Sequence, residues 1–323
     1  MTLSSPPGPS PKTSERYRAF HREVQKTFGE RIFRITINTG LTCPNIDGTR
    51  AKGGCTFCQD ASYLGLSFQE GLSVEKQLQT GMEYVRTRHQ TGRFFAYFQN
   101  GTNTHAPVPV LKKIYNQTLA NSNIAGLMIG TRADCLGPEV LDLLEELNGR
   151  TYLWMELGLQ SHKNDVLKRI NRAHTAGEFE SAAKNLDKRK IKVCAHVILG
   201  LPGETPADTI DKARFINQLP VAGIKIHNLV VFKKTALEKQ YREGTIALQD
   251  LKTYASACTD FLEHLRPDIM VQRLNAHGPR EITVAPDWSI NKMATMNAIH
   301  DELEKRDAWQ GKKLGYEINA LTS

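Results

Sequence analysis

The segment KVCAHVILGLPGET, residues 192–205, joins a nearly uninterrupted apolar strand to a glycine-rich turn. Strands that are apolar on both faces are typical of parallel sheets covered by helices. Similar short segments recur along the chain, and stretches with helical spacing lie between them. Strands are predicted at residues 32–38, 94–99, 125–130, 151–157, 192–199 and 224–231. Helices are predicted at residues 73–89, 108–120, 138–147, 177–189 and 206–218.

This alternation of strands and helices predicts an α/β fold. Parallel strands joined by helices pair through right-handed crossovers, which leaves a doubly wound sheet or a barrel. Both folds place their chemistry at the carboxyl ends of the strands. Polar and glycine-rich turns follow those ends here: TGLTCPN, QNGTNT, TRADC, GLQS and GLPGET. One rim of the sheet is therefore the predicted site.

The domain organisation predicted from these patterns has three parts. Residues 1–14 are rich in Ser and Pro and are expected to be a disordered tail. Residues 15–240 contain the repeating strands and helices. Residues 241–323 are expected to form a C-terminal α+β extension, with a long helical stretch, short segments at 270–274 and 281–285, and a helix at 290–305.

Composition excludes several classes of protein. Hydrophobic residues make up 40% and charged residues 24% of the 323 residues, values typical of a globular protein. No apolar run approaches the roughly 20 residues of a membrane-spanning helix, and no secretory signal precedes the fold, so we expect a cytoplasmic protein. The net charge of +8 favours a polyanionic partner, although an evenly basic surface is the alternative.

Three of the six cysteines lie in CPNIDGTRAKGGCTFC, at Cys43, Cys55 and Cys58. Structural zinc would need a fourth ligand, and the next histidine is His89. A zinc deaminase would have Pro before the close cysteine pair, where this chain has Gly54. A cubane cluster has four irons, so three thiolates leave one iron open to a small molecule. The spacing therefore favours a [4Fe-4S] cluster over zinc.

With these cysteines and rim sequences, residues 31–241 resemble a radical S-adenosylmethionine (SAM) enzyme. The barrel resembles that of the Elongator catalytic subunit and oxygen-independent coproporphyrinogen oxidase, and the wide cysteine spacing resembles the YhcC/YtqA group. The resemblance implies a partial (β/α)6 TIM-type barrel holding a [4Fe-4S] cluster and SAM. It also implies an electron donor such as flavodoxin or ferredoxin. One electron from the cluster would cleave SAM to methionine and a 5′-deoxyadenosyl radical, which removes hydrogen from a substrate.

The resemblance further implies which residues contact SAM. Asn100, Gly101 and Thr102 occupy the place of a glycine-rich turn that binds the SAM amino group, and Asn100 departs from the glycine expected there. Gln160 and Arg172 correspond to contacts with the SAM ribose and carboxylate, the alternative for Arg172 being a surface charge. The remaining implied contacts are Arg132 after the third strand, His196 on the fifth strand and Gly200 in the turn that follows.

Several of these assignments keep an alternative. His196 occupies the place of an acidic ribose contact, but a histidine on an apolar strand is also a common core residue. Glu156 and His227 are expected either to line the pocket or to form buried polar pairs. The isolated cysteines are interpreted as buried thiols rather than a second cluster; they are Cys135, Cys194 and Cys258.

The resemblance also implies a substrate class. Relatives of this type are linked to modification of the C5 side chain of the wobble uridine of tRNA. The basic surplus is compatible with RNA; it includes Lys184, Lys188, Arg189, Lys190, Lys233, Lys234, Lys312 and Lys313. Radical chemistry on a small molecule or peptide, and an iron–sulfur scaffold without enzymatic activity, are the alternatives.

Overall fold

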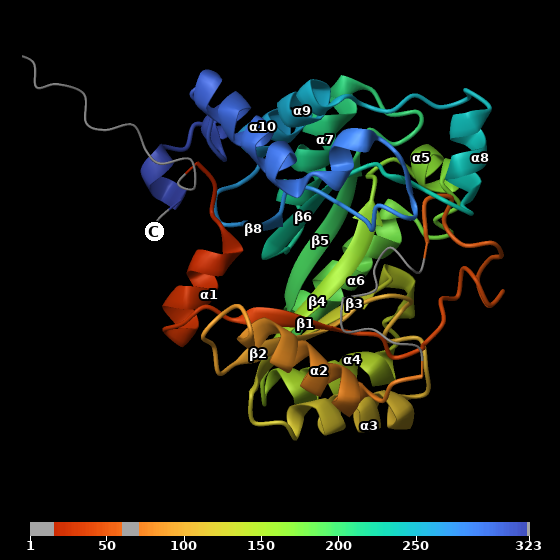
Figure 1. The fold of residues 1–323 in the computed structure, drawn as a ribbon, viewed down its shortest axis with the longest axis vertical. Coiled ribbons are helices and arrows are strands. Elements are labelled where there is room, and N and C mark those ends of the chain that lie inside the picture. The colour runs from red at the N-terminus through yellow and green to blue at the C-terminus, as the bar shows by residue number, and fades with distance from the viewer. Residues whose placement is uncertain (1–15, 60–70, 322–323) are drawn as a thin grey trace, which may run out of the picture.

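The computed structural model describes residues 16–59 and 71–321, so the predicted tail at residues 1–14 lies outside the described residues. Seven parallel strands form one curved sheet in chain order, and the sheet wraps partway around a barrel (Figure 1). The strands are β1 (Phe33–Ile37), β2 (Phe94–Phe98), β3 (Ile124–Thr131), β4 (Tyr152–Gln160), β5 (Lys192–Leu199), β6 (Gly223–Asn228) and β8 (Met270–Arg273). The α/β partial barrel predicted from the sequence is thus confirmed.

Helices cover the outer face of this sheet (Figure 1). Side-chain caps fix the start of several of them: Ser73 accepts a hydrogen bond from the amide of Lys76, and Thr175 and Glu178 form a reciprocal capping box. The helices between the first six strands are α2 (Val74–Arg86), α3 (Val108–Leu119), α4 (Pro138–Asn148), α5 (Asn164–Arg169), α6 (Ala176–Lys188) and α7 (Pro206–Asn217).

The sheet has one strand more than the six predicted. β8 pairs in parallel with β6, with Gly223 beside Met270, although its residues were expected in the C-terminal extension. The crossover to β8 runs through α8 (Ala236–Arg242) and α9 (Leu251–Glu263), and α10 (Lys292–Lys305) follows it. The single strand predicted at 224–231 is also divided, because β6 ends at Asn228 and β7 (Val231–Phe232) pairs antiparallel with β9 (Thr283–Ala285).

A helix that the sequence analysis did not predict closes the amino end of the barrel. This helix, α1 (Phe20–Phe28), buries Phe20 and Val24 against the inner face of the sheet. The ring of Phe20 meets that of Trp154 edge-on at 5.3 Å between centroids. The other buried members of this cluster are Ile32, Phe95, Tyr97, Met128 and Cys194. The inner core is separate from the larger core between the sheet and the outer helices.

We expect α1 to contribute strongly to stability. Phe20→Ala removes a ring that is 5% exposed and leaves a cavity beside Trp154, so the free energy of unfolding should fall by about 3–5 kcal/mol. Lys26→Ala, on the exposed face of the same helix, should change it by less than about 0.5 kcal/mol. Urea denaturation of both variants measures the difference, and equal losses would show that α1 is not a structural plug.

Candidate functional site

A cavity at the carboxyl ends of the strands brings the three predicted thiols together. Cys43, Cys55 and Cys58 line it. Seven of the eight residues predicted to contact SAM line the same cavity: Asn100, Gly101, Thr102, Arg132, Gln160, Arg172 and His196. Gly200 does not line this cavity, and a Cβ atom added to it would lie 2.8 Å from the side chain of Gln249.

None of the three cysteines forms a disulfide within the described residues, and Cys55 is the most enclosed of them. Its sulfur is approached by two N–H donors, Asn45 Nδ2 at 3.5 Å and Arg172 Nη1 at 3.6 Å. The amide of Asn45 is held by a second hydrogen bond, at 2.6 Å, to the carbonyl oxygen of Asn171. Donors aimed at a sulfur stabilise its thiolate form, which is the form that ligates metals.

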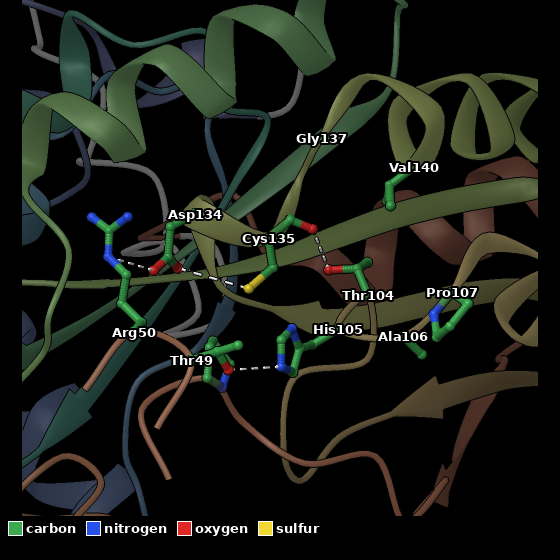
Figure 2. Close-up of a pocket in the computed structure, with 11 residues that line it drawn as sticks. Thr49, Arg50, Thr104, His105, Ala106, Pro107, Asp134, Cys135, Gly137 and Val140 are labelled. Atoms are coloured by element: carbon green, nitrogen blue, oxygen red, sulfur yellow. Dashed lines mark hydrogen bonds and ion pairs between the residues drawn. The ribbon is translucent and has the colours of Figure 1, made fainter. Parts of the chain in front are cut away.

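Ionic contacts fix the outer side of the cysteine loop, residues 43–58. The guanidinium of Arg50 lies 3.6 Å from Asp134 and also contacts Glu178, and His105 lies 2.9 Å from Asp47. Figure 2 shows the pocket around Arg50, Asp134 and His105, here called the outer pocket, which none of the three thiols lines. These contacts attach the loop to the end of β3, to α6 and to the turn after β2.

Cys135 also lines this outer pocket (Figure 2). Burial, with Asp134 beside it, raises the pKa of this thiol to about 12. Burial raises the pKa of Cys258 to about 12 as well, and that of Cys194 well above its ordinary value. All three thiols therefore stay protonated near neutral pH, unlike a metal ligand.

The turn after β2 packs against the chain that leads to Cys43. Asn100 and Gly101 both have positive φ angles, 74° and 64°. A Cβ atom on Gly101 would lie 2.2 Å from the carbonyl oxygen of Leu41, so only glycine fits there. Asn100 tolerates its conformation because its own side chain accepts a hydrogen bond from the amide of Gly101. The buried hydroxyl of Thr102 has no hydrogen-bond partner within residues 16–59 and 71–321.

Two buried arginines direct donors toward the cavity. Arg132 is held by a two-pronged contact with Asp134, at 2.9 and 2.8 Å, and its Nη1 is buried without a partner. Burial alone would lower the pKa of Arg132, but the Asp134 carboxylate raises it. Arg172 donates to the carbonyl oxygen of Gly158 at 2.8 Å, and its Nε is unpartnered. A Cβ atom on Gly158 would lie 2.7 Å from Arg172, so this glycine makes room for the guanidinium.

A buried charge cluster forms the floor of the cavity. Glu156 lies 2.8 Å from Lys225 and 2.6 Å from His196, and Lys225 also donates to the hydroxyl of Tyr97 at 3.0 Å. Burial alone would raise the pKa of Glu156, but Lys225 and His196 hold it well below its usual range. Burial and Lys225 lower the pKa of His196 to about 4. His196 therefore lines the cavity as a half-buried side chain that is hydrogen-bonded to Glu156, and its contact with the SAM ribose stays a prediction.

A second cavity adjoins the first on the β6 side. The two share Phe57, Gln99, Gln160, His196, His227 and Arg273. The buried Nε2 of His227 has no hydrogen-bond partner among the described residues. Burial, followed by His196 and Arg273, lowers the pKa of His227 well below its ordinary value. His227 is thus a cavity residue rather than one half of a buried hydrogen-bonded pair.

Sequence reasoning missed several residues of the site. Asn45 lies between the cysteines, where Asn has no fixed role in a cluster motif. Lys225 and Arg273 lie at neighbouring, inward-facing positions of β6 and β8. Arg273 had a usable signal, because it lies within the segment predicted at 270–274, but that segment was not recognised as a strand of the barrel.

Comparison with known proteins identifies the family. The model described as the radical SAM superfamily matches residues 45–216, and that of the radical SAM C-terminal domain matches residues 221–305. The chain is 38% identical to YtqA of Bacillus subtilis over 96% of each chain. It is 34% identical to YhcC of Escherichia coli over 92% of this chain and 94% of YhcC. This chain therefore belongs to the radical SAM superfamily of enzymes.

Two more distant matches concern parts of larger proteins. The tRNA uridine(34) acetyltransferase of Dehalococcoides mccartyi is 27% identical over 50% of this chain and 35% of its own length. The structure of Elp3 from the archaeon Methanocaldococcus infernus matches with a TM-score of 0.66 at 15% identity, covering 86% of this chain and 64% of Elp3. The second match supports the barrel fold. Within the described residues, no helix is long and apolar enough to cross a membrane.

The buried histidines predict that acid destabilises the protein. His196 and His174, with folded-state pKa values lowered mainly by burial to about 4 and about 3, fold in the neutral form. In the unfolded chain these histidines bind protons below their ordinary pKa of about 6.5. Each histidine should therefore lower the free energy of unfolding by about 1.4 kcal/mol per pH unit below that value. Denaturant unfolding should therefore show stability falling from pH 7 to pH 5.

A matched pair of variants checks this assignment. His196→Gln should flatten the dependence of unfolding free energy on pH between 6.5 and 5, because one neutral buried imidazole is removed. His89→Gln, at an exposed position, should leave the slope unchanged. An identical slope in the wild type and both variants would contradict the burial of a neutral His196.

Proposed function

We propose that this radical SAM enzyme holds a [4Fe-4S] cluster on Cys43, Cys55 and Cys58 and binds SAM at the iron that lacks a protein ligand. The observation that carries the proposal is the meeting of three cysteine side chains in a cavity lined by seven of the expected SAM contacts. The donors around Cys55 suit a thiolate. The high pKa values of the other three thiols make them poor competing ligands.

The donors without partners support the proposed SAM site. Three buried polar atoms around this cavity have no hydrogen-bond partner in the part of the chain that the structure describes: Thr102 Oγ1, Arg132 Nη1 and Arg172 Nε. An unsatisfied buried donor costs about 1–3 kcal/mol, so a bound group that accepts these hydrogen bonds is strongly favoured. We assign the carboxylate of SAM to the Arg172 side, because a guanidinium and a carboxylate form an oriented, charge-assisted pair. Gln160 and His196 are assigned to the ribose hydroxyls.

The bound cofactors would supply one chemical event, in which an electron cleaves SAM to methionine and a 5′-deoxyadenosyl radical that takes hydrogen from the substrate. The protein's own residues orient the reactants and exclude water. Lys225 neutralises Glu156 in the floor and neutral His196 hydrogen-bonds to the same carboxylate, so the floor presents no free carboxylate to the cavity. The electron would come from a flavodoxin- or ferredoxin-like donor.

For the substrate, we propose a uridine of tRNA, with modification of the C5 side chain at the wobble position. The partial match to a tRNA uridine(34) acetyltransferase supports this class of substrate. The net charge of +8 favours association with a polyanion. A small molecule or peptide substrate and a scaffold without enzymatic activity are the competing outcomes of the experiments below.

The cluster assignment predicts a sharp division among the six cysteines. After anaerobic reconstitution, the wild-type protein should hold about four irons and four acid-labile sulfides per chain. Cys43→Ala, Cys55→Ala or Cys58→Ala should lose the cluster, whereas Cys194→Ala and Cys258→Ala, at buried protonated thiols, should retain it. Iron, sulfide and zinc analysis with visible absorption checks this, and stoichiometric zinc without sulfide would refute the assignment.

The substrate assignment predicts that tRNA stimulates SAM cleavage. With a strong reductant, the reconstituted protein should release 5′-deoxyadenosine, and a tRNA lacking the modification should increase the rate. A transcript with another base at the wobble position is the matched control and should not increase it. Cleavage that ignores tRNA would leave a small molecule or peptide, and absence of cleavage by a protein with a full cluster would favour the scaffold.

A further inference from the structure

The partial barrel has a gap between its two edge strands. β1 and β8 end the seven-stranded order and do not pair with each other. Arg34 on β1 reaches across the gap and donates to Gln272 on β8 at 2.8 Å. The chain at Ala19 pairs with Val271, which places α1 beside β8 at this gap (Figure 1). A cavity, here called the seam, opens between β1, β8, α1 and α10.

The seam is rich in cations and lacks carboxylates. Arg31, Arg34, Arg273 and Lys292 line it, and none of its lining residues is Asp or Glu. Within residues 16–59 and 71–321, none of these four side chains forms an ion pair with a carboxylate. The Glu156 carboxylate attracts Arg34 electrostatically, but this carboxylate already contacts Lys225 and His196 at 2.8 and 2.6 Å. Four positive charges thus surround one cavity without a counter-charge.

The titration behaviour of neighbouring groups agrees with this excess of charge. Burial, followed by Arg273 and Arg34, lowers the pKa of Lys292. Burial, followed by Arg273 and Lys292, lowers the pKa of His277, which also lines the seam. Like charges that lie around one cavity repel one another, and a bound anion stabilises them. An anionic ligand would therefore relieve repulsion as well as form new hydrogen bonds.

Arg273 connects the seam with the proposed radical site. Its side chain lines the seam, the second cavity and the cavity of the three thiols. The second cavity also offers two polar atoms that have no hydrogen-bond partner among the described residues, His227 Nε2 and Asn228 Nδ2. A ligand whose anionic group lies in the seam can therefore place an adjoining polar ring in the second cavity, next to the expected SAM contacts Gln160 and His196.

We propose that the seam binds phosphate groups of the substrate and that the attached nucleoside extends through the second cavity toward SAM. This inference rests on the proposed function and deepens it. A single carboxylate would balance one of the four cations, whereas one or two phosphates carry enough charge for most of them. Arginine pairs with two phosphate oxygens at once, and lysine adds a point charge. The phosphate source is either an RNA strand or a free nucleotide.

Equilibrium binding to the reconstituted holoenzyme tests the proposal. The probes are uridine, uridine 5′-monophosphate, pyrophosphate and a short single-stranded RNA containing uridine. At least one phosphate-bearing probe should bind more tightly than uridine. Arg273→Gln combined with Lys292→Gln should weaken that binding at least tenfold, because two phosphate contacts are lost. If RNA is the source, the log–log salt slope should also become shallower, by about 0.7 per lost contact.

A charge-matched control distinguishes binding in the seam from binding through the overall positive charge of the protein. Lys239→Gln combined with Lys305→Gln removes the same charge at exposed positions, the second of them on α10 like Lys292, and should leave binding unchanged. Lys292→Gln alone, also on an exposed part of α10, should show about half the logarithmic effect if the double variant does not fold.

The two sources of phosphate give different results. Loss of RNA binding with no effect on the mononucleotide assigns the seam to an RNA backbone, and the reverse assigns it to a free nucleotide. Phosphate-bearing probes that bind no better than uridine, or equal losses in the seam and control variants, would overturn the proposal. Cleavage of SAM by the wild-type protein without substrate tests the proposed radical chemistry separately. A negative result in the phosphate-binding experiment can therefore be distinguished from a failure of the proposed radical chemistry.

Discussion

The buried contact between Glu156 and Lys225 is the constraint on which the interior of the barrel depends. Both side chains are fully buried, and their charged atoms lie 2.8 Å apart. Removing either partner would leave a buried charge uncompensated, which typically costs about 3–5 kcal/mol. The pair divides the barrel into two parts. Below it, α1 packs Phe20 and Val24 into an apolar plug, and above it lies the cavity of the thiols.

The cysteine loop depends on contacts from distant parts of the chain rather than on pairing with the sheet. Asn45 is fixed by the carbonyl oxygen of Asn171, and Arg50 by Asp134 and Glu178. The segment that follows α5 therefore both holds the loop and supplies Arg172, whose guanidinium approaches Cys55. A shift of this segment would move the thiols and the proposed SAM contact together. The geometry of the two proposed cofactor sites is thus coupled through one short stretch of backbone.

The sequence predicted those parts of the fold that depend on local periodicity and close spacing. Apolar strands alternating with helices indicated the parallel sheet, and the three cysteines within 16 residues do line one cavity. Features set by long-range pairing were missed. β8 is four residues long and joins β6 only after a crossover through two helices, and α1 presents just two buried residues. Gly200 packs against Gln249, a neighbour that the turn sequence alone did not indicate, and its contact with SAM stays a prediction.

Charge is distributed unevenly among the three cavities of the interior. Thiols and hydrogen-bond donors surround the cavity toward β2–β4, and unpaired cations surround the seam between β8 and β1. The neutral floor is essential to this arrangement, because an unpaired Glu156 would attract Arg34 and reduce the positive potential of the seam. An uncharged substrate would leave the repulsion among four cations uncompensated in both the free and the bound protein. A phosphate in the seam relieves that repulsion, and the free energy gained favours binding. Because the phosphate lies away from the reacting atom, it orients the substrate without contacting the bond that breaks.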